Sequence, residues 1–212
     1  MSNKSVDIAT MLDDLNLPVA ALRWKEIVTA PELADFTPYQ LFREVLEPQY
    51  IETMNNRYRT NLRLSKLIDK SALTENLVTS SKRRYNDAVV QQLLSFRFAE
   101  ERLNVGVYGI TEAGKSYFMS AFCNEACHRN YRCMFVDYCD LLDELLVLSR
   151  RDDLDKYRKK LKYYARIQIL FIDDFAISRY SEDGIKILYH LIKTRTDLKT
   201  STMFTSQYAP SE

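Results

Sequence analysis

The fold of this chain follows from one stretch of eight residues, Gly109-Ile110-Thr111-Glu112-Ala113-Gly114-Lys115-Ser116. The stretch matches the phosphate-loop pattern, in which two glycines separated by four residues lead into Lys and Ser. A β-rich segment over 104–108 precedes it and a segment of helical composition over 117–128 follows it. A chance match in an ordinary turn would need both the pattern and this context to coincide. The sequence therefore predicts a phosphate-binding loop between a strand and a helix.

The chemistry of such a loop comes from its backbone. Amide groups at the start of a helix lack helical partners, and together with the helix dipole they form a positive cradle for phosphate. We expect Lys115 to reach the β- and γ-phosphates and the Ser116 hydroxyl to bind Mg²⁺, so ATP and Mg²⁺ are the expected cofactors. The candidate nucleotide-binding residues are Gly109, Ile110, Thr111, Glu112, Ala113, Gly114, Lys115, Ser116 and Tyr117.

A second signal is the apolar run Ile167-Gln168-Ile169-Leu170-Phe171-Ile172, which is followed directly by Asp173-Asp174. Such a run is typical of a central parallel strand that is covered on both faces, and ligands of open α/β sheets bind at the carboxyl ends of the strands. One acid there can hold Mg²⁺ opposite Ser116, and the other can orient or deprotonate an attacking water. The alternative is that the two acids simply begin a loop.

The other segments after residue 128 complete an α/β pattern. We expect strands over 133–136 and 200–205 and helices over 141–148 and 183–194, which predicts a phosphate-loop core of three layers around a central parallel sheet. The last strand leads into Gln207, which can sense the γ-phosphate unless this is an ordinary strand terminus. Residues 150–166 carry eight basic and three acidic side chains and form either a DNA-facing surface or a solvated helix.

Residues 1–80 contain no glycine and read as helices punctuated by prolines. We expect Thr37 to cap a helix that begins at Pro38, with Gln40 reaching back to the cap, and Pro48 to kink or end that helix. The pattern over 49–68 is helical again and puts four cations on one face, which either follows a nucleic-acid backbone or faces solvent. These candidate DNA-binding residues are Arg59, Arg63, Lys66 and Lys70.

These segments predict three parts of the chain. The first is an all-helical N-terminal domain over 1–80 that binds DNA or a partner. The second is a linker over 81–103, which starts in the polar stretch 79–84 and contains a helix over 87–100. The third is the nucleotide-binding core over 104–212.

Composition narrows the class of protein only a little. The net charge of +1 means that DNA binding requires a local basic patch. The four cysteines lack a metal-binding spacing and are expected to be reduced core thiols of a cytoplasmic protein. We expect no signal peptide and no membrane partner, because no apolar run approaches the roughly 18 residues of a membrane span.

With both nucleotide motifs in place, residues from about 86 to 212 resemble the IstB-like family of insertion-sequence ATP-binding proteins, relatives of the DnaC helicase loader in the AAA+ class. The resemblance is carried by the segments 96–101, 109–116, 121–127, 170–175 and 201–207. It implies an ATPase that self-associates, assembles on double-stranded DNA without marked sequence preference and assists a transposase. It also implies roles for single residues: Lys115 contacts the β- and γ-phosphates, Ser116 and Asp173 hold Mg²⁺, Asp174 activates water and Gln207 is the first sensor.

Two departures from the family pattern lower the expected activity. Glu112 stands where relatives usually have Gly; a positive φ there would cost roughly 1–2 kcal/mol, and a carboxylate about 5 Å from a phosphate adds repulsion on the order of 3 kcal/mol. Relatives also continue with a fifth strand and a lid that carries arginines, whereas this sequence stops at Glu212. We therefore expect slow or absent ATP hydrolysis.

Three alternatives to a transposition ATPase remain at this point. A helicase loader of the DnaC type would share the ATPase core. A small-molecule kinase would need a pocket for a phosphate acceptor, against which the paired acids argue. A catalytically decayed module would keep the fold for interactions alone.

Overall fold

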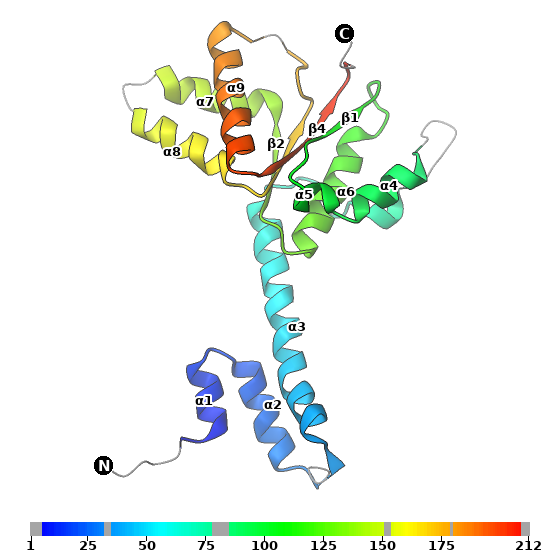
Figure 1. Ribbon diagram of the computed structural model, residues 1–212, viewed down its shortest axis with the longest axis vertical. Helices are drawn as coiled ribbons and strands as arrows, with labels where there is room; N and C mark the ends of the chain where they lie inside the picture. Colours follow the sequence, from blue (N-terminus) through cyan, green and yellow to red (C-terminus); the bar gives the residue numbers. More distant parts are fainter. Residues whose placement is uncertain (1–5, 32–34, 78–84, 151–153, 179, 209–212) are drawn as a thin grey trace. The chain divides into compact units, whose positions relative to one another are not determined.

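The computed structural model describes residues 6–31, 35–77, 85–150, 154–178 and 180–208 (Figure 1). Contacts within the chain divide it into two compact units, Met1–Arg59 and Thr60–Glu212. In the described residues no helix is long and apolar enough to cross a membrane.

The N-terminal unit contains α1 (Ile8–Asp14), α2 (Pro18–Val28) and most of α3 (Pro38–Leu64). Ala20 and Ile27 of α2 pack against Val45 of α3 in a small apolar core. The predicted cap of α3 is confirmed: the Thr37 hydroxyl donates to the Gln40 side-chain oxygen at 2.7 Å, and the Gln40 N–H donates to the Thr37 hydroxyl at 3.3 Å.

The helix α3 does not end at Pro48, which lies inside it. A proline removes one helical hydrogen bond and costs about 3 kcal/mol in a helix interior. Contacts on both sides of Pro48 stabilise the helix and offset this cost. Before the proline, Val45 is buried. After it, the Gln49 side-chain oxygen accepts hydrogen bonds from the Val19 and Ala20 N–H groups at 2.9 and 3.3 Å. Gln49 thus caps the N-terminus of α2, because the N-cap residue of α2 makes no side-chain hydrogen bond of its own.

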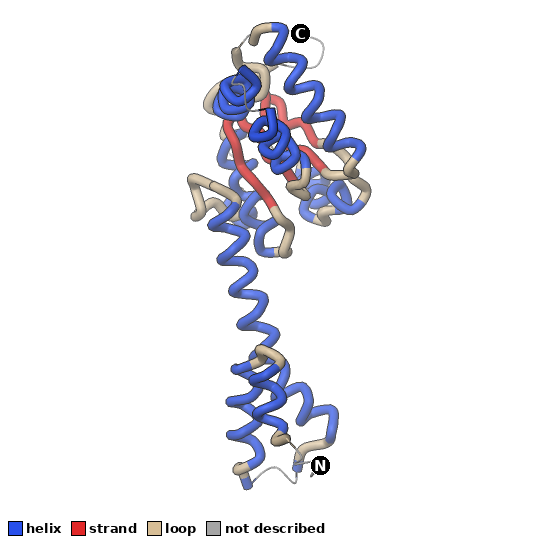
Figure 2. Tube along the Cα trace, turned by 90° about the vertical axis from the view of Figure 1, so that its left-hand side faces the viewer, coloured by secondary structure: helices blue, strands red, loops and turns tan. Residues whose placement is uncertain are grey.

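The second unit is built on a parallel sheet of four strands in the order β1-β4-β3-β2. Figure 2 shows the strands of this sheet in red. The strands are β1 (Val105–Tyr108), β2 (Cys133–Asp137), β3 (Ile169–Asp173) and β4 (Ser201–Ser206). The helices are α4 (Asp87–Leu94), α5 (Arg97–Glu100), α6 (Lys115–His128), α7 (Tyr138–Arg150), α8 (Leu154–Ala165) and α9 (Glu182–Asp197), and a 3₁₀ turn, η2, spans Thr74–Asn76.

Helices cover both faces of this sheet (Figure 1), as the predicted three-layer AAA+ phosphate-loop core requires. On one face α7, α8 and α9 enclose a core that includes Met134, Leu170 and Ile172. On the other face α6 is buried through most of its length. All four cysteines are free. Cys123, Cys127 and Cys133 are buried, as expected of core thiols, whereas Cys139 is only partly buried.

The expected helix over 87–100 is interrupted at Phe96, which has φ 57° and separates α4 from α5. The Phe96 side chain is 1% exposed, and its ring lies 5.7 Å from the Tyr131 ring and 6.3 Å from the Phe122 ring. Burial of this ring between α5 and α6 requires the chain to turn, which a continuous helix would not allow.

The segment after α3 packs on the sheet unit, so the division between the two units lies about twenty residues before the boundary expected near residue 80. The Phe135 N–H of β2 donates to the Ser65 carbonyl at 2.7 Å, and the Asn124 amide donates to the Ala72 carbonyl at 3.0 Å. Leu67 and Ala72 are buried. The polar stretch 79–84, in which the linker was expected to start, lies outside the described residues.

Candidate nucleotide-binding site

The predicted phosphate loop connects β1 to α6 at the carboxyl edge of the sheet. Gly114 has φ 88° and precedes the first residue of α6, a conformation that glycine adopts without steric cost. The Gly109 N–H donates to the Ser206 carbonyl at 3.2 Å, which ties the start of the loop to the end of β4. The loop therefore has a fixed entry and a helix N-terminus at its exit, as phosphate binding requires.

Lys115 is folded back on its own loop. The residue is buried, and its ammonium group donates hydrogen bonds to the Gly109 carbonyl at 2.8 Å and the Ile110 carbonyl at 2.9 Å. These two carbonyl oxygens accept hydrogen bonds from the ammonium group and so compensate for its burial inside the loop. A bound phosphate can replace them as acceptor and would then form the stronger charge-assisted bond.

Glu112 has φ 64°, so the loop does need the left-handed conformation at this position. The cost of roughly 1–2 kcal/mol therefore applies to this residue. The side chain is exposed, and water screens part of its repulsion from a phosphate.

The two predicted acids end β3 and begin the next turn. Asp173 is the register partner of Asp137 on β2, and Asp174 follows with φ 51°. Asp137 is already engaged, because its carboxylate accepts the N–H groups of Cys139 and Asp140 at the start of α7 at 2.7 and 3.1 Å. Burial raises the pKa of the Asp174 carboxyl above its usual value, and the negative charge of the nearby Asp173 raises it further. The positive charge of Lys115 lowers the pKa and so opposes the shift.

Gln207 lies against the phosphate loop. The Thr111 hydroxyl donates to the Gln207 side-chain oxygen at 2.9 Å. A cavity of about 400 Å³ is lined by residues from the loop, from the acid turn and from the end of β4. These are Thr111, Glu112, Gly114, Lys115, Ser116, Asp174 and Gln207.

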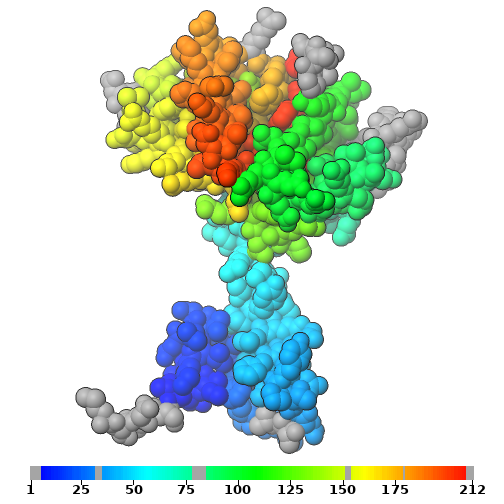
Figure 3. All heavy atoms as spheres, in the orientation of Figure 1, coloured from blue at the N-terminus to red at the C-terminus, as the bar shows by residue number. Residues whose placement is uncertain are grey.

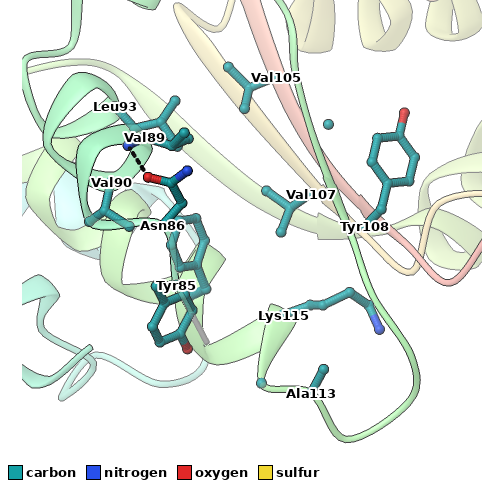
Figure 4. A pocket seen from close by; sticks show the side chains of 13 residues that line it. Tyr85, Asn86, Val89, Val90, Leu93, Val105, Val107, Tyr108, Ala113 and Lys115 are labelled. Carbon is teal, nitrogen blue, oxygen red and sulfur yellow. Dashed lines mark hydrogen bonds between the residues drawn. The ribbon is translucent and has the colours of Figure 1, made fainter. Parts of the chain in front are cut away.

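A second cavity of about 410 Å³ adjoins the first, since Gly114 and Lys115 line both. It lies between α4 and the free edge of β1, with Val105 and Val107 on one side and Tyr85 and Asn86 on the other (Figure 4). The Asn86 side-chain oxygen caps α4 by accepting the Ala88 N–H at 3.1 Å, so its amide donors remain for a ligand. The cavity is mainly apolar, whereas the first is lined by charged and polar groups.

The residues of the polar cavity fit Mg²⁺ held together with phosphate. Mg²⁺ prefers oxygen ligands, keeps several waters and binds few protein groups when phosphates complete its shell. Ser116 supplies a hydroxyl at the start of α6 and Asp174 supplies a carboxylate, and both residues line the cavity. Asp173, directly before Asp174, supplies a second carboxylate beside the cavity but is not among its lining residues. The described residues contain no group of three or more His, Cys, Asp or Glu that could hold a metal without such a ligand.

The predicted row of four cations does not lie on one helix face. The helix α3 ends at Leu64, and Lys66 has φ 57°, so only Arg59 and Arg63 keep the helical spacing. The reason is that the chain leaves the helix to place Ser65 and Leu67 against the sheet unit. All four cations are exposed.

A different basic face lies on α8, within the stretch for which the sequence left DNA and solvent as alternatives. Three exposed cations of α8 stand at helical spacing, and the exposed Arg166 follows directly after the last residue of the helix. The three are Arg158, Lys159 and Lys162. Among the described residues none of them has an acidic partner within 4.0 Å, whereas Lys160 pairs with Glu144 at 2.6 Å. Figure 3 shows the surface of α8, in yellow, beside that of α9, in orange.

Two sets of site residues were not predicted from the sequence. Tyr85 and Asn86 precede α4, and only their position just before a short helix hinted at a cap. Thr205 was expected only as the last residue of a strand, and its hydroxyl donates to Asp173 Oδ1 at 2.5 Å. The register of β3 and β4, which decides this contact, cannot be read from local sequence.

Fold and site together define a phosphate-loop protein of the AAA+ class. The family model described as IstB-like ATP binding protein matches residues 10–212, and this chain belongs to that family. It is 23% identical over 181 residues to the putative ATP-binding protein of insertion sequence IS5376 from Geobacillus stearothermophilus, covering 85% of this chain and 70% of that protein. It is 26% identical to the corresponding protein of IS1162 from Pseudomonas fluorescens, covering 69% of this chain and 62% of that protein.

Solved structures show the same fold at low sequence identity. The crystal structure of the DnaC helicase loader superimposes with a TM-score of 0.54 at 20% identity, over 66% of this chain and 78% of that one. AMPPCP-bound DnaA from Aquifex aeolicus superimposes with a TM-score of 0.56 at 19% identity, over 69% of this chain and 44% of that one. This chain thus spans less than half the length of that DnaA.

Proposed function

We propose that this chain is an ATP-binding AAA+ protein that assembles on DNA and assists a transposase in DNA transposition. The observation that carries the ATP part is the polar cavity, in which the phosphate loop, Asp174 and Gln207 meet although they come from three separate segments. Membership in the IstB-like family and the names of the insertion-sequence relatives support the transposition part.

In this proposal each part of the site has one task. Lys115 leaves the loop carbonyls to contact the β- and γ-phosphates, Ser116 and Asp173 hold Mg²⁺, and Asp174 orients the attacking water. Gln207 contacts the γ-phosphate. The base occupies the adjoining apolar cavity, where Tyr85 offers a ring and Asn86 offers amide donors. Bound Mg²⁺ supplies neutralisation of phosphate charge.

Hydrolysis by the isolated chain is proposed to be slow. No arginine is among the described residues that line the polar cavity, and an arginine that stabilises the transition state is worth roughly 10³ to 10⁵ in rate in phosphoryl-transfer enzymes. Self-association on DNA is one way in which a second copy can supply that group.

The test is ATP binding in the presence of Mg²⁺ by the wild-type chain and by Lys115→Ala, measured by isothermal titration. We expect wild-type binding and its loss in the variant, because the lysine contact is charge-assisted. Equal binding by both proteins would favour a module that keeps the fold without the nucleotide chemistry.

A second candidate function is helicase loading, which the structural likeness to DnaC favours. The ATP site would be the same, so only partners separate the two functions. Pull-down by the full chain of its cognate transposase or of a replicative helicase distinguishes them.

A further inference from the structure

The end of β4 lies beside the turn that carries both acids. The Thr205 side chain is fully buried; its hydroxyl donates to Asp173 Oδ1 at 2.5 Å and accepts the Asp174 N–H at 2.9 Å. The Thr205 carbonyl accepts the Phe175 N–H at 2.7 Å. Thr205 of β4 is therefore hydrogen-bonded to three consecutive residues, 173–175, at the end of β3 and in the turn that follows it.

The two partners of the Thr205 hydroxyl fix its direction. A backbone N–H can only donate, so the Asp174 N–H occupies a lone pair of Oγ1 and the hydroxyl proton points to the Asp173 carboxylate. The carboxylate is held through Oδ1, and no hydrogen bond to Oδ2 is found among the described residues. Oδ2 thus remains for another ligand, with the carboxylate already oriented.

The same contacts hold Asp174 in an uncommon backbone conformation. Its φ of 51° is left-handed, which Asp adopts more readily than most residues but which persists only when the surroundings determine it. The bonds from the Asp174 and Phe175 N–H groups to Thr205 supply that constraint.

We infer that Thr205 is a positioning residue of this site: it orients Asp173 toward the divalent cation of a bound nucleotide. This inference rests on the proposed ATP and Mg²⁺ binding. Ligand orientation by a partner that holds the remaining ligand atom is a general feature of metal sites, and loss of the partner commonly costs roughly 10- to 100-fold in metal affinity.

The experiment measures nucleotide binding by the full chain over a range of Mg²⁺ concentrations and again in EDTA. Thr205→Val keeps the shape and removes the hydroxyl, Thr205→Ala is a smaller second variant, and Thr205→Ser keeps the hydroxyl. Ser201→Ala is the matched control, because Ser201 lies on the same strand, is 1% exposed and donates its hydroxyl to the Phe98 carbonyl at 3.2 Å, far from the acids.

We expect the half-saturating Mg²⁺ concentration to rise about ten-fold or more in Thr205→Val and Thr205→Ala, with nucleotide binding in EDTA unchanged. Thr205→Ser and Ser201→Ala should keep the wild-type Mg²⁺ dependence. Wild-type Mg²⁺ dependence in a folded Thr205→Val or Thr205→Ala would overturn the positioning role and leave the proposed function standing. Absence of nucleotide binding by the wild-type chain would overturn both.

Discussion

The Thr111 hydroxyl donates a hydrogen bond of 2.9 Å to the side-chain oxygen of Gln207, 96 residues later in the chain. The phosphate loop and the end of β4 are thus in direct contact. The bond uses the Gln207 oxygen and leaves its NH₂ group, which has two donors, for a phosphate.

The first prediction concerns discrimination between ATP and ADP. Gln207→Leu removes the amide donor, and a hydrogen bond to a charged group is worth about 1.5–3 kcal/mol. We expect ATP affinity to fall by about ten-fold or more while ADP affinity stays the same, as measured by competition binding. Gln207→Glu should bind ATP still more weakly, because it adds repulsion. An unchanged ratio of ATP to ADP affinity would remove Gln207 from the sensor role.

The second prediction concerns Glu112, whose φ of 64° is unfavourable for a residue with a Cβ. Glu112→Gly should stabilise the fold by up to about 1 kcal/mol, since relief of the strain is partly offset by entropy of the unfolded chain. It should also tighten ATP binding. Glu112→Gln separates the two effects, because it removes the charge and keeps the strain: affinity should rise without a gain in thermal stability. A Gly variant with unchanged stability would contradict the strain argument.

Local signals in the sequence predicted most of the fold and the phosphate side of the site. The loop 109–116 and the run ending at Asp173 are each recognisable from a few neighbouring residues, and both lie at the carboxyl edge of the sheet as expected. The cap at Thr37 is equally local.

The differences arose where distant contacts decide the local structure. Of the two alternatives for Pro48, a kink or a helix end, the helix end is wrong, because Gln49 and Val45 are held by α2. The helix α3 ends at Leu64 because Ser65 bonds to β2. The contact between Thr205 and Asp173 joins residues 32 apart and depends on the register of two strands. None of these partners is adjacent in sequence, so residue type and spacing did not reveal them.

The third prediction concerns Arg195, which is 1% exposed and is held by hydroxyl and carbonyl oxygens. Its guanidinium donates to Thr202 Oγ1 at 2.9 Å and to the carbonyls of Tyr164, Ile167 and Ser201, and burial lowers its pKa to about 9. Arg195→Met should destabilise the fold by about 3 kcal/mol or more, because buried acceptors lose their donor. Thermal unfolding checks this, and Arg97→Met, which removes an exposed ion pair with Glu101, should cost less than about 1 kcal/mol. Equal effects would contradict the role of Arg195.

The fourth prediction follows from the raised pKa of Asp174. The folded state binds more protons than the unfolded state between the ordinary aspartate pKa of 3.8 and the raised value, so wild-type stability decreases as pH rises through this window. Asp174→Asn should therefore be slightly more stable than wild type at neutral pH, and the advantage should shrink as pH falls and the wild-type carboxyl becomes protonated. Urea unfolding at several pH values measures this. An advantage that does not vary with pH would exclude the carboxyl charge as its cause.

The last prediction concerns DNA and the basic face of α8. Each phosphate neutralised contributes about −0.9 to the slope of log affinity against log salt concentration for duplex DNA. Lys159→Gln and Lys162→Gln should therefore each reduce the steepness by about one, and the double variant by about two, if both side chains contact phosphates. Lys25→Gln is the matched control, because Lys25 lies 3.7 Å from Asp13 in the N-terminal unit. Every one of these variants removes one positive charge. If the salt dependence became less steep in Arg59→Gln and Arg63→Gln but not in the α8 variants, the DNA contact would lie on α3 and not on α8.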